Sequence, residues 1–278
     1  MTGPTTGSLR VNGATLHYEV RGRGPLLLLV PGGTGGAASM DAVADTLAAA
    51  YTVATYDPRG MSRSTLDDPE AEQRVTEHAD DAYRLLNHLS PDEPARIFGA
   101  SSGAIVAVHL LTAHPERVAR VVAHEPPLVE VLPDAARHRV LVARVRDTFR
   151  TQGLMPAVAV FAAGLAGDGG TTTPEAELRL PPQAAARAEQ TLADLPYFVG
   201  RIVPAFMSYA PDLDRLAALA DRLVLACGEE SRGELTYRPA AFLAERLGLE
   251  LQHCPGGHTG LTTHPGEFGE VLAKMLRD

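Results

Sequence analysis

The stretch Gly99–Gly103, which reads G-A-S-S-G, constrains the fold of this chain more than any other feature. It follows a short apolar run at 95–98 that predicts a buried strand, and it precedes the apolar residues 104–111, which predict a buried helix. A strand, a G-x-S-x-G turn and a helix are typical of the sharp turn that presents a nucleophilic serine at a helix N-terminus. The pattern therefore predicts an exposed Ser101 hydroxyl, although the pentapeptide alone also fits a glycine-rich loop that caps an ordinary helix.

Predicted strands and helices alternate along the chain, which is typical of a parallel, doubly wound sheet of the α/β class. The continuous apolar run at 26–30 fits a strand that is covered on both faces. The other strands are expected at 15–20, 52–56, 95–98, 117–123, 222–227 and 249–253. Helices are expected between and after them, at 38–50, 76–89, 104–111, 239–247 and 265–274.

The alternation stops between residues 126 and 215, where no parallel strand is predicted. Helical patterns occupy 135–150, 155–165, 182–192 and 198–209, with Pro- and Gly-rich joints at 167–174 and 181–182. A helical insertion in an α/β sheet most simply covers the carboxyl edge, where ligands bind in open sheets; helices packed only for stability are the alternative. We therefore predict a core formed by 1–125 and 216–278 and an inserted helical cap (lid) formed by 126–215.

Charge and hydropathy exclude several classes of partner. The net charge is −9 and the sequence contains no basic run, so nucleic acid and anionic membrane surfaces are poor partners. No apolar run approaches the length that crosses a bilayer, and residues 1–13 have neither the basic nor the apolar part of a secretory leader. The expected partner is a small-molecule substrate; a homodimer is compatible with the sequence, which does not specify it.

The two cysteines, Cys227 and Cys254, are too few for a disulfide framework, although the sequence does not forbid one bridge between them. We expect both to be small buried hydrophobic residues, which fits a reducing cytoplasm. No spacing of Cys, His or carboxylates indicates a metal site. The sequence thus predicts a cytoplasmic protein that uses no metal and no other cofactor.

A serine hydroxyl is a weak nucleophile at neutral pH, so it needs a base within hydrogen-bond reach and a third group that orients the base. His258 lies in a glycine-rich loop after the last predicted strand, and we expect it to be the base. His264, which precedes a proline at a helix start, is predicted to be structural.

Two carboxylates compete for the role of the third group. Glu125 follows a predicted strand and is held by two prolines. Glu230 lies in the loop after Cys227. In many proteins with such a serine turn an aspartate in this loop orients the histidine, but this chain has Ser231 at that position. We favour Glu125, and we expect the neighbouring His124 to be a packing histidine whose ring nitrogens are satisfied.

The oxyanion hole is expected to combine two backbone amides, one of which belongs to Ser102, the residue after the nucleophile. The other should come from the glycine loop at 31–36, which follows the strand at 26–30 and has Gly33 in its third position. A phosphate-binding role for this glycine loop is disfavoured because its spacing is not G-x-G-x-x-G and no lysine follows.

Several motifs resemble the α/β-hydrolase superfamily and, within it, the zearalenone hydrolase (lactonase) group, across essentially the whole chain. The narrower motifs are Asp57 followed by Gly60–Ser64 (G-M-S-R-S), and His124, Glu125 and Pro127. The more widespread ones are Ser101–Ala104, and Pro255 and Gly256 with His258, His264 and Pro265. The resemblance implies an α/β-hydrolase fold, with a mostly parallel eight-stranded doubly wound sheet and a helical cap, and a catalytic triad of Ser101, Glu125 and His258.

The same resemblance implies a cofactor-free serine hydrolase (an esterase or lactonase) that opens an ester or lactone of an apolar substrate, such as an aromatic macrolactone of the zearalenone type, through an acyl-enzyme. Other classes of protein share the fold and remain alternatives. They are proline iminopeptidase-like enzymes, carbon–carbon bond hydrolases, cofactor-free oxygenases or perhydrolases, and slow-turnover ligand receptors.

The chain departs from the group's pattern at two positions. The group carries a cap tryptophan, whereas this chain has no tryptophan and places Phe198 there, and the group has an aspartate where this chain has Gly32. The residues expected to bind substrate are Gly32, Leu132, Met155, Phe161, Tyr197, Phe198, Phe206 and Met207.

Overall fold

The computed structural model describes residues 3–166 and 182–277, so the predicted joint at 167–174 and Pro181 lie outside the described residues. A nine-stranded sheet runs through the molecule in the order β1-β2-β4-β3-β6-β7-β8-β9, and β5 pairs with β2 off this path. The strands are β1 (Thr5–Val11), β2 (Ala14–Gly22), β3 (Leu26–Val30), β4 (Thr52–Tyr56), β5 (Thr65–Leu66), β6 (Ala95–Ala100), β7 (Val118–His124), β8 (Leu223–Gly228) and β9 (Gln252–Cys254).

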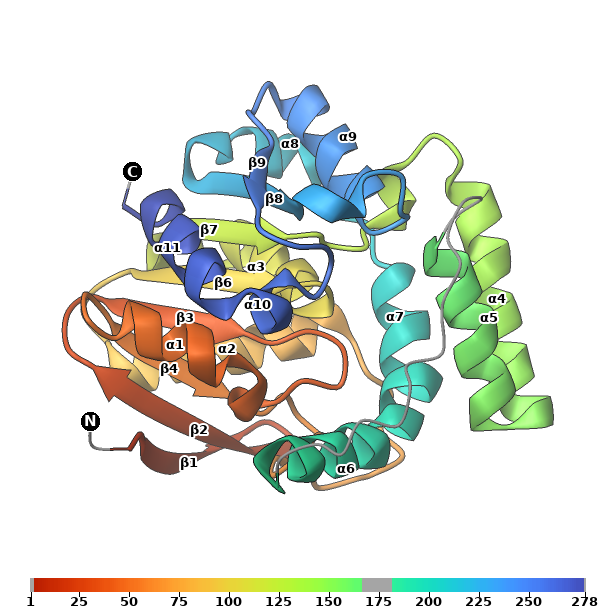
Figure 1. Ribbon diagram of the computed structural model, residues 1–278, viewed down its shortest axis with the longest axis horizontal. Coiled ribbons are helices and arrows are strands. Elements are labelled where there is room, and N and C mark those ends of the chain that lie inside the picture. Colours follow the sequence, from red (N-terminus) through yellow and green to blue (C-terminus); the bar gives the residue numbers. More distant parts are fainter. Residues whose placement is uncertain (1–2, 167–181, 278) are drawn as a thin grey trace.

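All strands from β4 to β9 along this order pair in parallel, and β1, β2 and β5 form the antiparallel end. Helices cover both faces (Figure 1) because alternate residues of a buried strand point to opposite sides. Leu27 and Leu29 pack with α1 and α11, whereas Leu26 and Leu28 pack with α2, α3 and α9. These helices are α1 (Asp41–Leu47), α2 (Val75–Leu89), α3 (Ser102–Ala113), α9 (Tyr237–Leu247) and α11 (Pro265–Met275).

The sheet differs from the prediction at its edges. The sequence pattern predicts no strand before residue 15, yet β1 pairs with β2 through a turn at Gly13, whose φ is +71°. Because β1 is an edge strand with mostly exposed side chains, it carries little apolar signal. The two-residue β5 makes the sheet nine-stranded rather than eight-stranded, and the last strand begins at Gln252 rather than at 249.

The described residues between β7 and β8 are mainly helical, and in Figure 1 their helices α4, α5 and α7 stand beside one end of the sheet. A separate apolar cluster, which includes Val145, Val199 and Val203, holds these helices together. The predicted boundary at 215 falls inside α8, whose Leu216 is buried in the main core. The elements are α4 (Ala135–Gln152), α5 (Leu154–Ala166), α6 (Pro182–Tyr197), a π-helical turn (Phe198–Ile202), α7 (Val203–Met207) and α8 (Leu213–Ala217).

The π-helical turn interrupts what the sequence predicts as one helix over 198–209. Pro196 and Pro204 flank it, and each lacks a backbone N–H, so the regular ladder of helical hydrogen bonds is broken on both sides. Such turns are common at functional sites.

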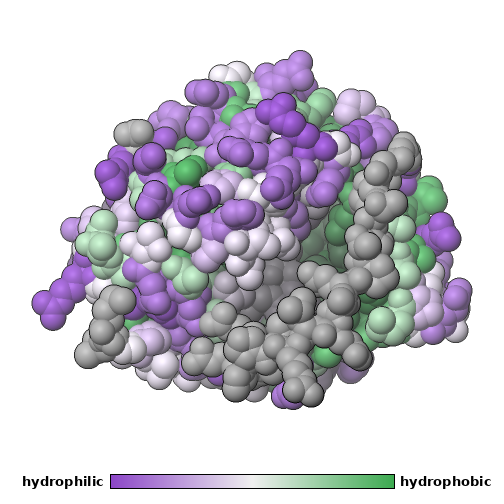
Figure 2. All heavy atoms as spheres, viewed as in Figure 1, coloured by the Kyte–Doolittle hydropathy of each residue, from purple (hydrophilic) through white to green (hydrophobic). Residues whose placement is uncertain are grey.

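Side chains of different hydropathy are unevenly distributed over the surface. Figure 2 shows mainly hydrophilic residues over much of the visible face, whereas apolar residues gather over α4 and α5. Val140 and Met155 in these helices are 68% and 66% exposed. None of the helices in the described part of the chain is both long and apolar enough to cross a membrane.

Candidate active site

Ser101 occupies the sharp turn between β6 and α3. Its φ of 52° and ψ of −120° are strained for a residue with a side chain, and such strain is concentrated at functional sites. The flanking glycines are required by close packing, because a Cβ on Gly99 would lie 2.5 Å from the Gly103 carbonyl oxygen and a Cβ on Gly103 would lie 2.3 Å from that of Val30. The turn therefore holds the Ser101 side chain at the N-terminal end of a buried helix.

Three residues from distant parts of the chain meet at this turn. The His258 Nε2 atom lies 3.1 Å from the Ser101 Oγ atom, and its Nδ1 atom lies 2.6 Å from Glu125 Oε2. His258 comes from the loop between β9 and α10 (Gly260–Thr263). The imidazole can thus accept the serine proton on one nitrogen while the carboxylate orients it through the other.

Glu125 directly follows β7 and is fully buried, with a φ of 46°. Its backbone N–H donates to the Ala226 carbonyl at 2.9 Å, and its Oε1 accepts a hydrogen bond from the Gly228 N–H at 2.8 Å. Burial alone would raise the pKa of this carboxyl, but the hydrogen bond and charge of His258 outweigh it and lower the pKa to about 2. Glu125 is therefore a carboxylate at neutral pH.

Glu230, the other candidate acid, is exposed. Its backbone N–H donates to the Gly256 carbonyl at 3.0 Å, and its carboxylate makes no hydrogen bond or ion pair to His258. Ser231 is fully buried, and its hydroxyl has no hydrogen-bond partner among the described residues. The structure thus brings Glu125, and not Glu230, to the histidine.

One of the two expected oxyanion amides, that of Gly33, already has a partner. The Gly33 N–H donates to the Ser102 Oγ atom at 3.0 Å, so a substrate oxyanion would have to replace this hydroxyl. Gly32 lies directly against the nucleophile, because a Cβ there would be 2.8 Å from the Ser101 Cβ and 2.2 Å from the Ala100 carbonyl oxygen. With this backbone, an aspartate at position 32 would not fit.

His124 differs from the expectation of a satisfied packing histidine. Its side chain is fully buried, and neither ring nitrogen has a hydrogen-bond partner among the described residues. The ring lies 6.4 Å from that of His258 at an interplanar angle of 27°. Burial lowers the pKa of His124 to about 4, so the ring is neutral. Its place directly before Glu125 is the only sequence signal for this position.

A cavity of about 510 Å³, within the usual range for small-molecule sites, lies over Ser101 and His258. Five of the predicted substrate-binding residues line it, namely Gly32, Phe161, Phe198, Phe206 and Met207. Thr191, Ile202 and Val203 also line the cavity but were not among the predicted residues. Ile202 and Val203 could have been predicted from the sequence, because positions 198, 202, 203, 206 and 207 recur at the spacing of one face of a helix.

Three predicted substrate-binding residues do not line this cavity. Leu132 is buried in the apolar cluster of the α4–α7 helices, and Met155 is largely exposed. Tyr197 instead donates its hydroxyl to the Arg59 carbonyl at 3.2 Å. Within the described ranges, no group of three or more His, Cys, Asp or Glu side chains could hold a metal ion.

Comparison with known proteins places the chain in a family. A model of the alpha/beta hydrolase fold family matches residues 25–152. The uncharacterized hydrolase YraK of Bacillus subtilis is 36% identical over 287 aligned residues, which cover 97% of this chain and 95% of YraK. A zearalenone hydrolase of Cladophialophora bantiana is 26% identical over 97% of this chain and 95% of its own length.

Among solved structures, a hydrolase from Pseudomonas aeruginosa is similar with a TM-score of 0.75 and 21% identity, over 98% of both chains. The predicted fold class and the resemblance to the superfamily are thereby confirmed, apart from the ninth strand. The chain belongs to the α/β-hydrolase superfamily.

Proposed function

We propose that this hydrolase uses Ser101 to cleave an ester or lactone bond through an acyl-enzyme. The observation that carries the proposal is the hydrogen-bonded series from Ser101 Oγ to His258, at 3.1 Å, and from His258 to Glu125, at 2.6 Å. His258 takes the serine proton while Oγ attacks the carbonyl carbon, and Glu125 stabilises the imidazolium that forms. Each atom needed for these transfers lies within hydrogen-bond reach.

The tetrahedral intermediate carries its negative charge on the former carbonyl oxygen. In the proposal, this oxyanion accepts hydrogen bonds from the amides of Ser102 and Gly33, and the N-terminus of α3 adds a favourable dipole. The intermediate collapses as His258 gives its proton to the leaving alkoxide. Water, activated by His258, then attacks the acyl-enzyme and releases the acid and the free serine. With a lactone, the product is a single hydroxy acid.

The proposed substrate is apolar. Aromatic and aliphatic side chains form much of the cavity wall, and Phe161 and Phe198 meet edge to face there, with ring centroids 6.2 Å apart. The similarity to a zearalenone hydrolase along nearly the full length supports an aromatic macrolactone as substrate. Phe198 would contact the ring of such a substrate as part of the apolar wall.

Labelling with a fluorophosphonate probe tests the mechanism. The wild type should be labelled, Ser101→Ala should not, and Ser90→Ala, a substitution at the end of α2, should be labelled like the wild type. A folded wild type that stays unlabelled refutes the proposed function. Turnover of zearalenone beside short-chain nitrophenyl esters and simple lactones then identifies the substrate class.

We also propose that the protein works in a reducing compartment such as the cytoplasm. Cys227 and Cys254 are both free and buried, and burial raises the pKa of the Cys254 thiol to about 12. Thiols of this kind are inert packing groups rather than reactive ones.

A further inference from the structure

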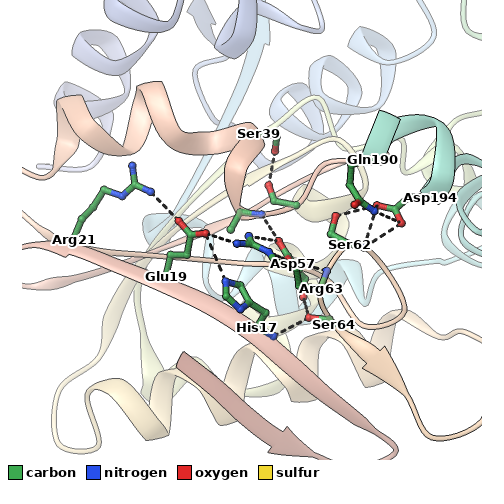
Figure 3. A network of polar contacts seen from close by, with 12 residues as sticks. His17, Glu19, Arg21, Ser39, Asp57, Ser62, Arg63, Ser64, Gln190 and Asp194 are labelled. Carbon is green, nitrogen blue, oxygen red and sulfur yellow. Dashed lines mark hydrogen bonds and ion pairs between the residues drawn. The ribbon is translucent and has the colours of Figure 1, made fainter. Parts of the chain in front are cut away.

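The motif Gly60–Ser64 lies outside the triad, yet its residues Ser62 and Arg63 connect the loop after β4 with α6 and with the glycine loop (Figure 3). It follows β4, and its backbone turns sharply, since φ is +75° at Gly60 and +51° at Ser62. A Cβ on Gly60 would lie 2.6 Å from the ring of Tyr197, so only glycine allows the end of α6 to approach so closely. The motif is thus shaped to contact the helical segment between β7 and β8.

Ser62 makes the main polar contact with α6. Its backbone N–H lies 3.0 Å from both carboxylate oxygens of Asp194, and its hydroxyl donates to Asp194 Oδ2 at 2.9 Å. Asp194 is only 7% exposed, and its other partner is the Gln190 side-chain amide at 3.2 Å. Because a serine with positive φ is strained, the two hydrogen bonds to Asp194 offset an unfavourable backbone conformation of Ser62.

The next residue connects this contact to the glycine loop. The Arg63 guanidinium and backbone N–H both donate to the Asp57 carboxylate, the closest pair being 2.7 Å apart. Asp57 is fully buried and accepts the Ala37 N–H at 2.7 Å. A Cβ on Gly36 would lie 2.4 Å from Asp57 Oδ1 and 2.9 Å from Ser62 Oγ. The end of the glycine loop is therefore pinned between Asp57 and Ser62.

The helix that carries Asp194 also contributes to the substrate cavity. Thr191 precedes Asp194 by three positions, Phe198 follows it by four, and both line the cavity over Ser101. Thr191 and Gln190 also line a smaller cavity of about 140 Å³ together with Ser62 and the glycine loop. A shift of Asp194 away from Ser62 would thus move the wall that faces an extended substrate.

We propose that Ser62 and Asp194 are positioning residues that clamp α6 against the glycine loop and so set the shape of the substrate cavity. The clamp acts on the part of the substrate that reaches Thr191 and Phe198, whereas the reacting carbonyl is held by the triad and the oxyanion amides. The expected effect on ester hydrolysis rests on the proposed function, whereas the expected effect on the packing of α6 does not.

The kinetic test compares two esters of different length. Asp194→Asn should raise KM for p-nitrophenyl octanoate about tenfold, while kcat/KM for p-nitrophenyl acetate changes by less than about threefold. Ser62→Gly keeps the N–H donor and relieves the strained φ, so its effect should have the same direction and be smaller. The double variant should be no worse than Asp194→Asn alone, because the two changes remove one contact.

Arg201→Gln is the matched control. Arg201 joins the same helical segment to the loop after β5 through an ion pair with the exposed Glu70, and it makes no hydrogen bond to Ser62 or Asp194. Exposed pairs contribute little, so both esters should be hydrolysed within twofold of the wild type. An equal loss with both esters in Asp194→Asn, or the same change in Arg201→Gln, would overturn the clamp.

Hydrogen exchange gives a measurement that needs no turnover. Asp194→Asn should speed amide exchange in residues 188–197 about tenfold while exchange in β6 and α3 stays unchanged, and unchanged exchange in 188–197 refutes the clamp. A wild type inactive on both esters would count against the proposed function, and the exchange result would then decide the clamp by itself.

Discussion

Replacing Glu125 by Gln should lower kcat/KM about 10⁴-fold, the loss that an acid-to-amide change causes in a serine protease triad. The structure explains the magnitude. The carboxylate accepts hydrogen bonds on both oxygens, from His258 Nδ1 at 2.6 Å and from the Gly228 N–H at 2.8 Å. Glutamine has one acceptor, so one of these donors must face an NH₂ group.

Each of the two orientations is costly. If the amide NH₂ faces His258, the imidazole is held in the tautomer that cannot take the serine proton. If it faces Gly228, a fully buried N–H loses its acceptor, at about 1–3 kcal/mol, and the imidazolium still loses its counter-charge. A 10⁴-fold loss corresponds to about 5.4 kcal/mol, which the lost charge-assisted bond and the lost charge together can supply.

Hydrolysis of a nitrophenyl ester measures this effect, with thermal unfolding as the check that the variant is folded. Glu230→Gln is the matched control and should retain activity within twofold, because Glu230 is exposed and its carboxylate does not contact His258. If Glu230→Gln abolishes turnover while Glu125→Gln retains it, the assignment of the acid is wrong.

Three further expectations follow from the packing around the sharp turn at Ser101 and from the groups near it. Gly103→Ala should lower the free energy of unfolding by about 3 kcal/mol because its Cβ meets backbone oxygens, whereas Gly266→Ala, with open space around its Cβ, should be neutral or stabilising in urea unfolding; equal effects contradict this. Burial lowers the pKa of His124 from 6.5 to about 4, so the unfolded chain binds an extra proton between these values. The free energy of unfolding should therefore fall by about 3 kcal/mol as pH drops through that window, and His124→Phe should remove this part of the slope; an unchanged slope refutes it. Ser102→Ala frees the Gly33 amide for the oxyanion, so kcat should be unchanged or rise up to about tenfold; a tenfold fall would mean that the hydroxyl itself assists the reaction.

The sequence alone was sufficient to predict the fold class and the sharp turn at Ser101. These depend on local causes: apolar periodicity specifies buried strands and helices, and the steric demands of a tight turn require glycine at both ends. It was also predictable that His258, Glu125 and Glu230 lie at one edge of the sheet, because residues that follow parallel strands gather there. The edge strands β1 and β5 were missed because exposed or very short strands carry almost no apolar pattern.

Only the tertiary structure decided which carboxylate reaches His258, which side chains line the cavity and what the motif at Gly60–Ser64 contacts. Met155 and Phe161 belong to the same helix, yet one is exposed and the other faces the cavity. Ser62 and Asp194 are 132 positions apart and meet only because α6 packs onto the loop after β4. Contacts of this kind depend on how whole elements are oriented, and no local pattern of residues encodes that orientation.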